Sequence, residues 1–158
     1  MITLNEAEAV EVSISAVEEG DESRAFQALD SLTGIAADFL SKNEEADAER
    51  VIQSIKTAAQ AAAEKEMELV TINSVLSLGK LARAAADKGF ESILGKAFIA
   101  VGKLGEASAA NSLEAGSKVA ATTLVEIWNF FPEQWDQEKI IAFSLLFKEI
   151  GRASCRER

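Results

Sequence analysis

The segments Ala61-Ala-Ala-Glu-Lys-Glu-Met-Glu68, Ala84-Ala-Ala-Asp-Lys-Gly-Phe-Glu91 and Ala107-Ser-Ala-Ala-Asn-Ser-Leu-Glu114 are copies of one motif, and each begins 23 residues after the one before. The upstream segments Leu78-Gly-Lys-Leu81 and Val101-Gly-Lys-Leu104 keep the same spacing. A fixed period indicates a repeat architecture, because each unit is too small to bury its apolar face alone and must pack on its neighbours. We therefore expect a stack of similar units.

The composition indicates that these units are helical. The chain has 158 residues, of which 48% are hydrophobic and 27% charged, and these values are typical of a globular protein with a real core. It contains a single Pro and many Ala, Glu, Lys and Leu residues, and proline disfavours helices while the others favour them. An all-α fold is the expectation.

The period predicts an acidic helix within residues 1–19, five units, the start of a truncated unit at 135–148 and a tail at 149–158. In the second unit the apolar residues recur at spacings of three and four, which places them on one stripe of a helix. Asp21 or Ser23, Asn43 and Ser112 are candidate N-caps, Gly89 a helix stop, and Pro132 ends the fifth helix. The five units are 20–42, 43–65, 66–88, 89–111 and 112–134.

Short loops between units favour antiparallel neighbours, so two units form a helical hairpin of 46 residues, twice the 23-residue period. In period and apolar pattern, residues 20–134 resemble the HEAT/armadillo-like α-solenoid group, whose repeats have about 40–47 residues. The resemblance does not identify a subfamily. It implies a superhelical scaffold that presents a groove to other proteins, and a compact helical bundle is the alternative fold.

The C-terminal segment 149–158 resembles the conceptual translation of a common sequencing adapter, and we expect it to be non-native. A polar tail after a helix that ends at Gly151 is the alternative. If the segment is foreign, the protein continues beyond about Lys148 and the only cysteine, Cys155, is not its own. The apolar face of the truncated end would then lack its cover, and self-association through it is expected.

The missing residue types exclude several kinds of chemistry. Without histidine or a native cysteine, the chain lacks the usual zinc ligands, thiolate nucleophiles and imidazole bases, so we expect no cofactor, no metal and no enzymatic activity. Two buried carboxylates could still act as acid and base, but no pair stands out. The N-terminus lacks the features of a signal peptide, which favours a cytoplasmic location.

The charge is asymmetric and acidic. Residues 1–49 carry 13 acidic and two basic side chains, whereas residues 50–148 carry 11 of each. Because nucleic acids and anionic lipids attract clustered Lys and Arg, neither is expected as a partner. The most apolar stretch, 140–147, is also far shorter than the ~20 residues that a membrane-spanning helix needs.

Two features occur at equivalent positions of neighbouring units. Gly79 and Gly102 lie within predicted helices, where glycine costs about 1 kcal/mol relative to alanine. Close approach of neighbouring helices explains this cost better than exposure of backbone to a ligand. Lys80 and Lys103 follow the glycines and should point away from the apolar stripe. They are candidate partner-binding residues if they line one face of the stack, although exposed lysines are usually only solvated.

The aromatic residues gather late in the chain, and the most prominent are Trp128 and Trp135. The simpler interpretation is a core shared with following units, and the alternative is a partner-binding or membrane-interface patch that includes both tryptophans. For the whole chain we predict a non-catalytic scaffold for protein–protein interaction, with an unknown protein partner. The alternative is a structural spacer or oligomerisation segment of a larger, membrane-associated or enzymatic protein.

Overall fold

A computed structural model describes residues 4–131 of the chain, and within this range it contains helices and no strand. The predictions for the truncated unit at 135–148, for the tail at 149–158 and for Trp135 lie outside the described residues. The all-α prediction is confirmed. The helices are α1 (Glu6–Glu19), α2 (Glu22–Ser41), α3 (Glu45–Glu64), α4 (Glu68–Lys88), α5 (Glu91–Ala110) and α6 (Glu114–Trp128).

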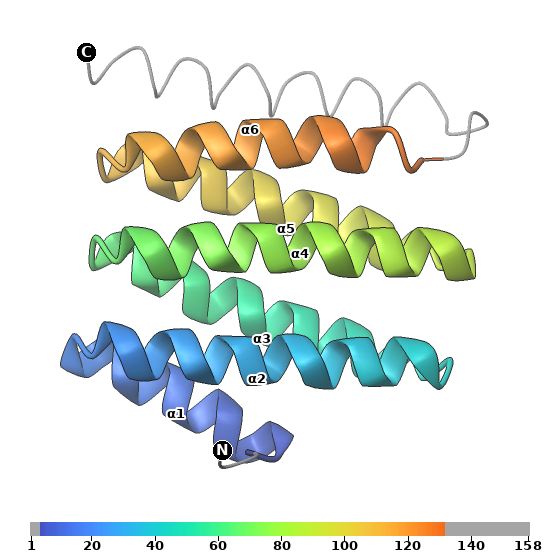
Figure 1. Cartoon of the computed structure of the whole chain (residues 1–158), viewed down its shortest axis with the longest axis horizontal. Coiled ribbons are helices and arrows are strands. Elements are labelled where there is room, and N and C mark those ends of the chain that lie inside the picture. Colours follow the sequence, from blue (N-terminus) through green and yellow to red (C-terminus); the bar gives the residue numbers. More distant parts are fainter. Residues whose placement is uncertain (1–3, 132–158) are drawn as a thin grey trace.

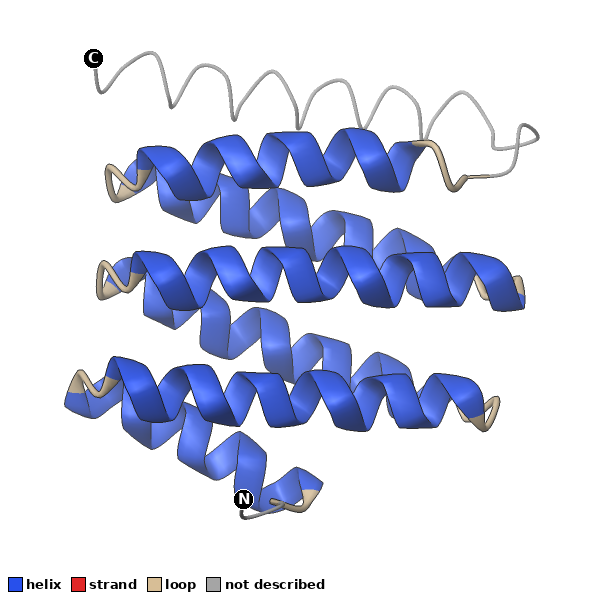
Figure 2. Cartoon of the chain, in the orientation of Figure 1, coloured by secondary structure: helices blue, strands red, loops and turns tan. Residues whose placement is uncertain are grey.

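The helices lie antiparallel in chain order and form two layers (Figure 1). One layer holds α1, α3 and α5, and the other holds α2, α4 and α6 (Figure 2). Each helix packs against the next helix and the next but one, and among these six helices none contacts a helix further along the chain. This open stack is the arrangement of an α-solenoid, whereas a compact bundle would close back on its first helix.

The turns between the helices repeat in backbone detail. Five residues with positive φ lie 23 apart, and the amide of the residue after each donates to the carbonyl five residues earlier. These 6→1 bonds are the Schellman motif, which satisfies carbonyls at a helix C-terminus. The positive-φ residues are Gly20, Asn43, Glu66, Gly89 and Ser112, and the bonds join Asp21 to Ala16, Glu44 to Phe39, Met67 to Ala62, Phe90 to Ala85 and Leu113 to Ser108.

Only part of the predicted capping pattern occurs. Asp21 caps α2 by accepting from the amide of Arg24 at 3.1 Å, as predicted. The N-cap predictions for Asn43 and Ser112 are wrong, because both occupy the left-handed position just before the cap. Short polar residues suit either position, since asparagine also tolerates left-handed backbone. The pattern alone could not separate these roles.

Glu66 occupies a position that suits glycine. Its φ is 61°, while Gly20 and Gly89 hold 75° at the equivalent places in other turns. A left-handed residue with a Cβ is strained by about 1–2 kcal/mol. We expect Glu66→Gly to stabilise the fold by about 1 kcal/mol and to raise the Tm by about 3 °C, measured by thermal unfolding. The reverse change, Gly89→Ala, should lower the Tm; a rise there would contradict the explanation.

A continuous core fills the space between the layers. All of the apolar residues predicted for the stripe in unit 43–65 are buried on α3. Unit 89–111 carries apolar residues at the same helical spacing, and these are also buried on α5, except Phe90, which is half-buried just before the helix begins. Alanine recurs at these buried positions and lets the layers approach closely. The α3 set is Val51, Ile52, Ile55, Ala58, Ala59 and Ala62.

The glycines predicted to allow close packing lie within the helices. Gly102 is buried on α5. A Cβ at Gly79 on α4 would lie 2.9 Å from Cγ2 of Thr123 on α6, which is shorter than any ordinary contact. At this point α4 and α6 approach so closely that there is no room for a side chain. The packing interpretation therefore holds for Gly79.

Candidate functional site

The two candidate lysines are exposed, but the structure does not bring them together. Lys80 lies on α4 and Lys103 on α5, so they belong to different layers. Lys103 pairs with Glu106 at 3.6 Å on its own helix. The structural repeat is a two-helix hairpin of 46 residues, and at this spacing Lys80 corresponds to Gly34 and Lys103 to Thr57. Within residues 4–131 these two lysines therefore form no row on one face, and their binding role stays a prediction.

Trp128 is half-buried at the last position of α6 and belongs to an aromatic cluster. Its ring meets Phe131 edge-on at 5.5 Å, and Phe131 meets buried Phe98 of α5 at 5.4 Å. Edge-to-face pairs at these distances stabilise a folded core. Trp128 therefore takes part in packing between α5 and α6, and its role in partner binding stays a prediction.

A groove that sequence reasoning missed lies between the first halves of α2 and α4, which run side by side in one layer (Figure 1). Its volume is about 650 Å³. The apolar lining is exposed to solvent: Leu69 is 67% exposed, Leu76 46% and Phe26 39%. The remaining lining residues are Ile72 and the polar residues Glu22, Ser23, Gln27 and Asn73.

A signal for this groove does exist in the sequence. On α4, Leu69, Ile72 and Leu76 follow the spacing i, i+3, i+7, which forms a second apolar stripe beside the buried one. A helix that lies in one layer and packs against the other needs one such stripe for its core contacts. In the described structure Leu69 and Leu76 of this second stripe are exposed and Ile72 is half-buried. Only the placement of α2 beside the stripe forms a groove.

The apolar lining is not a requirement of the repeat. At the 46-residue spacing, α6 carries Ala115, Lys118 and Thr122 where α4 carries its three groove residues, and all three α6 residues are exposed. The same layer therefore packs with small or polar residues at these positions. Because burial in the stack does not explain the apolar residues of α4, the groove is the candidate functional site.

Acidic residues lie near one end of the groove, and one of them, Glu22, lines it. α2 and α4 both begin at this end, and residues 18–24 and 64–68 around their starts carry seven acidic and two basic side chains, a net charge of −5. One of the two bases, Arg24, is already paired with Glu19 at 2.8 Å. Acidic side chains at helix starts suit the helix dipole, but they also give the groove a negative rim.

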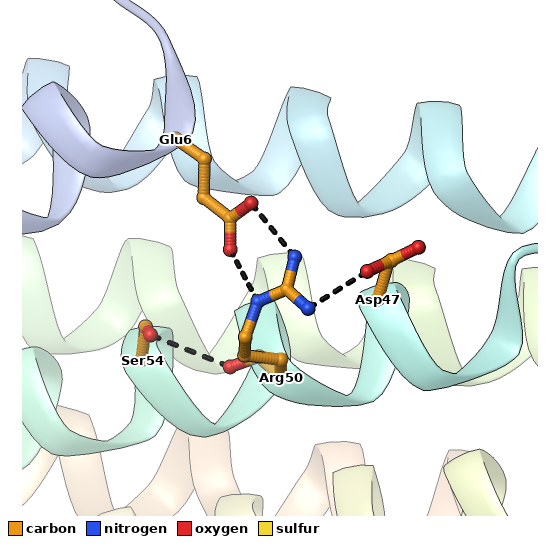
Figure 3. Close-up of polar contacts among 4 residues, drawn as sticks. All are labelled: Glu6, Asp47, Arg50 and Ser54. Carbon is orange, nitrogen blue, oxygen red and sulfur yellow. Dashed lines mark hydrogen bonds and ion pairs between the residues drawn. The ribbon is translucent and has the colours of Figure 1, made fainter.

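A separate charged cluster joins α1 to α3 (Figure 3). Arg50 on α3 donates from Nε and Nη2 to both carboxylate oxygens of Glu6 on α1, at 2.7 and 2.9 Å, and from Nη1 to Asp47 at 2.7 Å. The hydrogen bond from Arg50 lowers the pKa of Glu6 below its usual range, and the two carboxylates raise the pKa of Arg50. The cluster lies away from the groove and fastens the first helix to the stack.

The lowered pKa of Glu6 predicts a pH-dependent contribution to stability. A carboxylate with a depressed folded pKa stabilises the fold above its unfolded pKa of about 4.3, and this contribution is lost as the pH falls through the lower folded value. We expect Glu6→Gln to lower the Tm by about 2 °C at neutral pH, since exposed pairs contribute little. In thermal unfolding at acidic pH the difference should vanish.

The control for this measurement is Glu11→Gln. Glu11 is exposed on α1 and has no ion-pair partner among residues 4–131. Its replacement should leave the Tm unchanged at both pH values. A Tm loss for Glu6→Gln that persists at acidic pH would contradict an electrostatic origin.

The described part of the chain holds few polar groups in its interior. Its buried polar side chains are all serine or threonine hydroxyls, and several donate to carbonyls of their own helix, as Thr71 does to Met67 at 2.9 Å and Ser74 to Val70 at 2.8 Å. Within residues 4–131 no cluster of three His, Cys, Asp or Glu side chains could hold a metal ion. No helix in this range is long and apolar enough to cross a membrane.

In the described part of the chain, these features form a stack of helices with an open, apolar, negatively rimmed groove. Comparison of the chain with protein-family models, with curated proteins and with solved structures gives no match.

Proposed function

We propose that the chain is a non-catalytic helical-repeat scaffold, of the HEAT/armadillo-like kind, that binds protein partners. The observation that carries this proposal is the groove between α2 and α4, where Leu69 is 67% exposed. Exposed apolar patches with a polar rim are typical of binding sites, because water contact with them is unfavourable. The corresponding residues of α6 are small or polar, so stacking of the repeats does not require apolar residues at these positions.

The architecture supports the same function. In a stack where each helix touches only its near neighbours, two long faces remain open to solvent, and residues on them can change without loss of the core. A surface of this kind suits recognition of other proteins. A spacer needs length and stability but no exposed leucines, so the groove favours the scaffold over the spacer.

Photo-cross-linking tests this proposal across the whole surface. A benzophenone amino acid is placed at single exposed positions, including Leu69 in the groove and Ile99 on α5, in the complete protein in its own cells. Adducts are then identified by mass spectrometry. We expect one protein to be recovered repeatedly from a contiguous set of positions. The absence of any adduct over both faces would favour the spacer and contradict the scaffold.

A further inference from the structure

We propose that the groove between α2 and α4 binds an amphipathic helix of a partner protein, with apolar residues at i, i+3 or i+4, and i+7 and with Lys or Arg beside them. This inference rests on the proposed function and adds the chemistry of the partner. The length of the groove, its polar groups and the charge around it support this partner chemistry.

The length of the groove fits two turns of a helix. On α4 its lining runs from Leu69 to Leu76, seven residues apart, which corresponds to about 10 Å at 1.5 Å per residue. Over that distance a helix presents three side chains to one side. An extended segment rises about 3.3 Å per residue and alternates its side chains, so only about two would enter the groove.

The polar lining also favours a helix. An extended segment brings unpaired backbone amides and carbonyls, and burying these without partners is costly. The groove offers only Ser23, Gln27 and Asn73 as neutral polar partners. A helix satisfies its own backbone, so its apolar face can lie against Phe26, Leu69 and Leu76 without that cost.

The negative rim determines the charge of the partner. Residues 18–24 and 64–68 carry a net charge of −5 at one end of the groove, and basic side chains beside the apolar stripe of the ligand would meet them. A second copy of this chain is disfavoured, since its residues 1–49 carry 13 acidic against two basic side chains. An anionic lipid surface is disfavoured for the same reason.

The test uses a designed peptide of about 15 residues, long enough to form a helix on binding. It carries Leu at i, i+4 and i+7, Lys on the other faces and a fluorescent label, and its binding to the full chain is measured by anisotropy. One control peptide has the same composition in scrambled order, and another has Glu in place of Lys. The protein variants are Leu69→Ser with Leu76→Ser, and Ile99→Ser as the matched change outside the groove.

We expect the Leu/Lys peptide to bind the natural chain, and the double groove variant to bind it at least about tenfold more weakly. Ile99→Ser should bind as the natural chain does, while both control peptides should bind at least about tenfold more weakly. Affinity should fall as salt rises, because the rim is screened. Circular dichroism with unchanged helix content would confirm that the variants are folded.

Several results would overturn the inference. One is no binding of the Leu/Lys peptide up to about 1 mM. The others are a scrambled or acidic peptide that binds as tightly as the Leu/Lys peptide, and a double groove variant that binds the Leu/Lys peptide as tightly as the natural chain does. A dimer of the natural chain that this variant converts to monomer would assign the groove to a second copy. Sedimentation with anionic vesicles that the variant abolishes would assign it to lipid. Cross-links confined to other faces would leave the scaffold intact while this inference fails.

Discussion

Replacing Leu78 with alanine should cost about 3 kcal/mol of unfolding free energy and lower the Tm by about 10 °C. Leu78 is fully buried on α4, which packs against α2, α3, α5 and α6. The truncation removes buried apolar contacts and leaves a cavity. The helices that pack around Leu78 on four sides are too rigid to fill it. Urea denaturation followed by circular dichroism measures the loss, with the m-value as a check on two-state behaviour.

The matched control is Leu76→Ala, two residues away on the same helix. Leu76 is 46% exposed in the groove, so its truncation creates no cavity and should change stability by less than about 0.5 kcal/mol. Similar losses for the two variants would mean that α4 does not pack against the other layer as described. An unchanged midpoint for Leu78→Ala would have the same meaning.

Replacing Gly79 with leucine should destabilise the fold by about 2 kcal/mol. A Cβ at this position would lie 2.9 Å from Cγ2 of Thr123, and Thr123 is itself buried, so α4 and α6 would have to move apart. Leucine favours a helix more than glycine by about 1 kcal/mol, and the expected loss remains after this gain. Thermal and urea unfolding measure the effect.

Gly34 supplies the opposite case for the same substitution. It lies within α2 and is exposed, and a Cβ at this position would meet no atom within 4 Å beyond its own helix backbone and chain neighbours. Gly34→Leu should therefore stabilise the fold by about 0.5–1 kcal/mol through helix propensity alone. If both glycine variants gain stability, the close approach of α4 and α6 is not a constraint.

The 23-residue period predicted the helical units well because helix, turn and core recur together. The residues of the α3 stripe are buried, and the backbone of each turn takes the same Schellman form at the same interval. Apolar spacing of three and four residues is a local property that does not depend on which neighbour covers the stripe. The packing role of Gly79 was also predicted from a local property, because glycine within a helix lowers stability and close packing explains why it is there.

The candidate site was harder to predict. Lys80 and Lys103 occupy equivalent positions in the 23-residue pattern, yet consecutive helices lie in different layers. Residues that are equivalent on one surface are therefore spaced 46 residues apart in the chain. The groove depends on Leu69 of α4 lying beside Phe26 of α2, which are 43 residues apart. A single-helix pattern records which faces are apolar but not which face another helix covers.

The sequence by itself determined that the chain folds into helices, where these helices turn, and which stripe of each is buried, because backbone propensity and apolar periodicity act within one unit. Only the tertiary structure decided that alternate helices share a layer, that the second stripe of α4 stays open and that acidic helix starts meet at one end of it. Those outcomes depend on contacts between residues far apart in the chain, and their energies come from the packing of one helix on another.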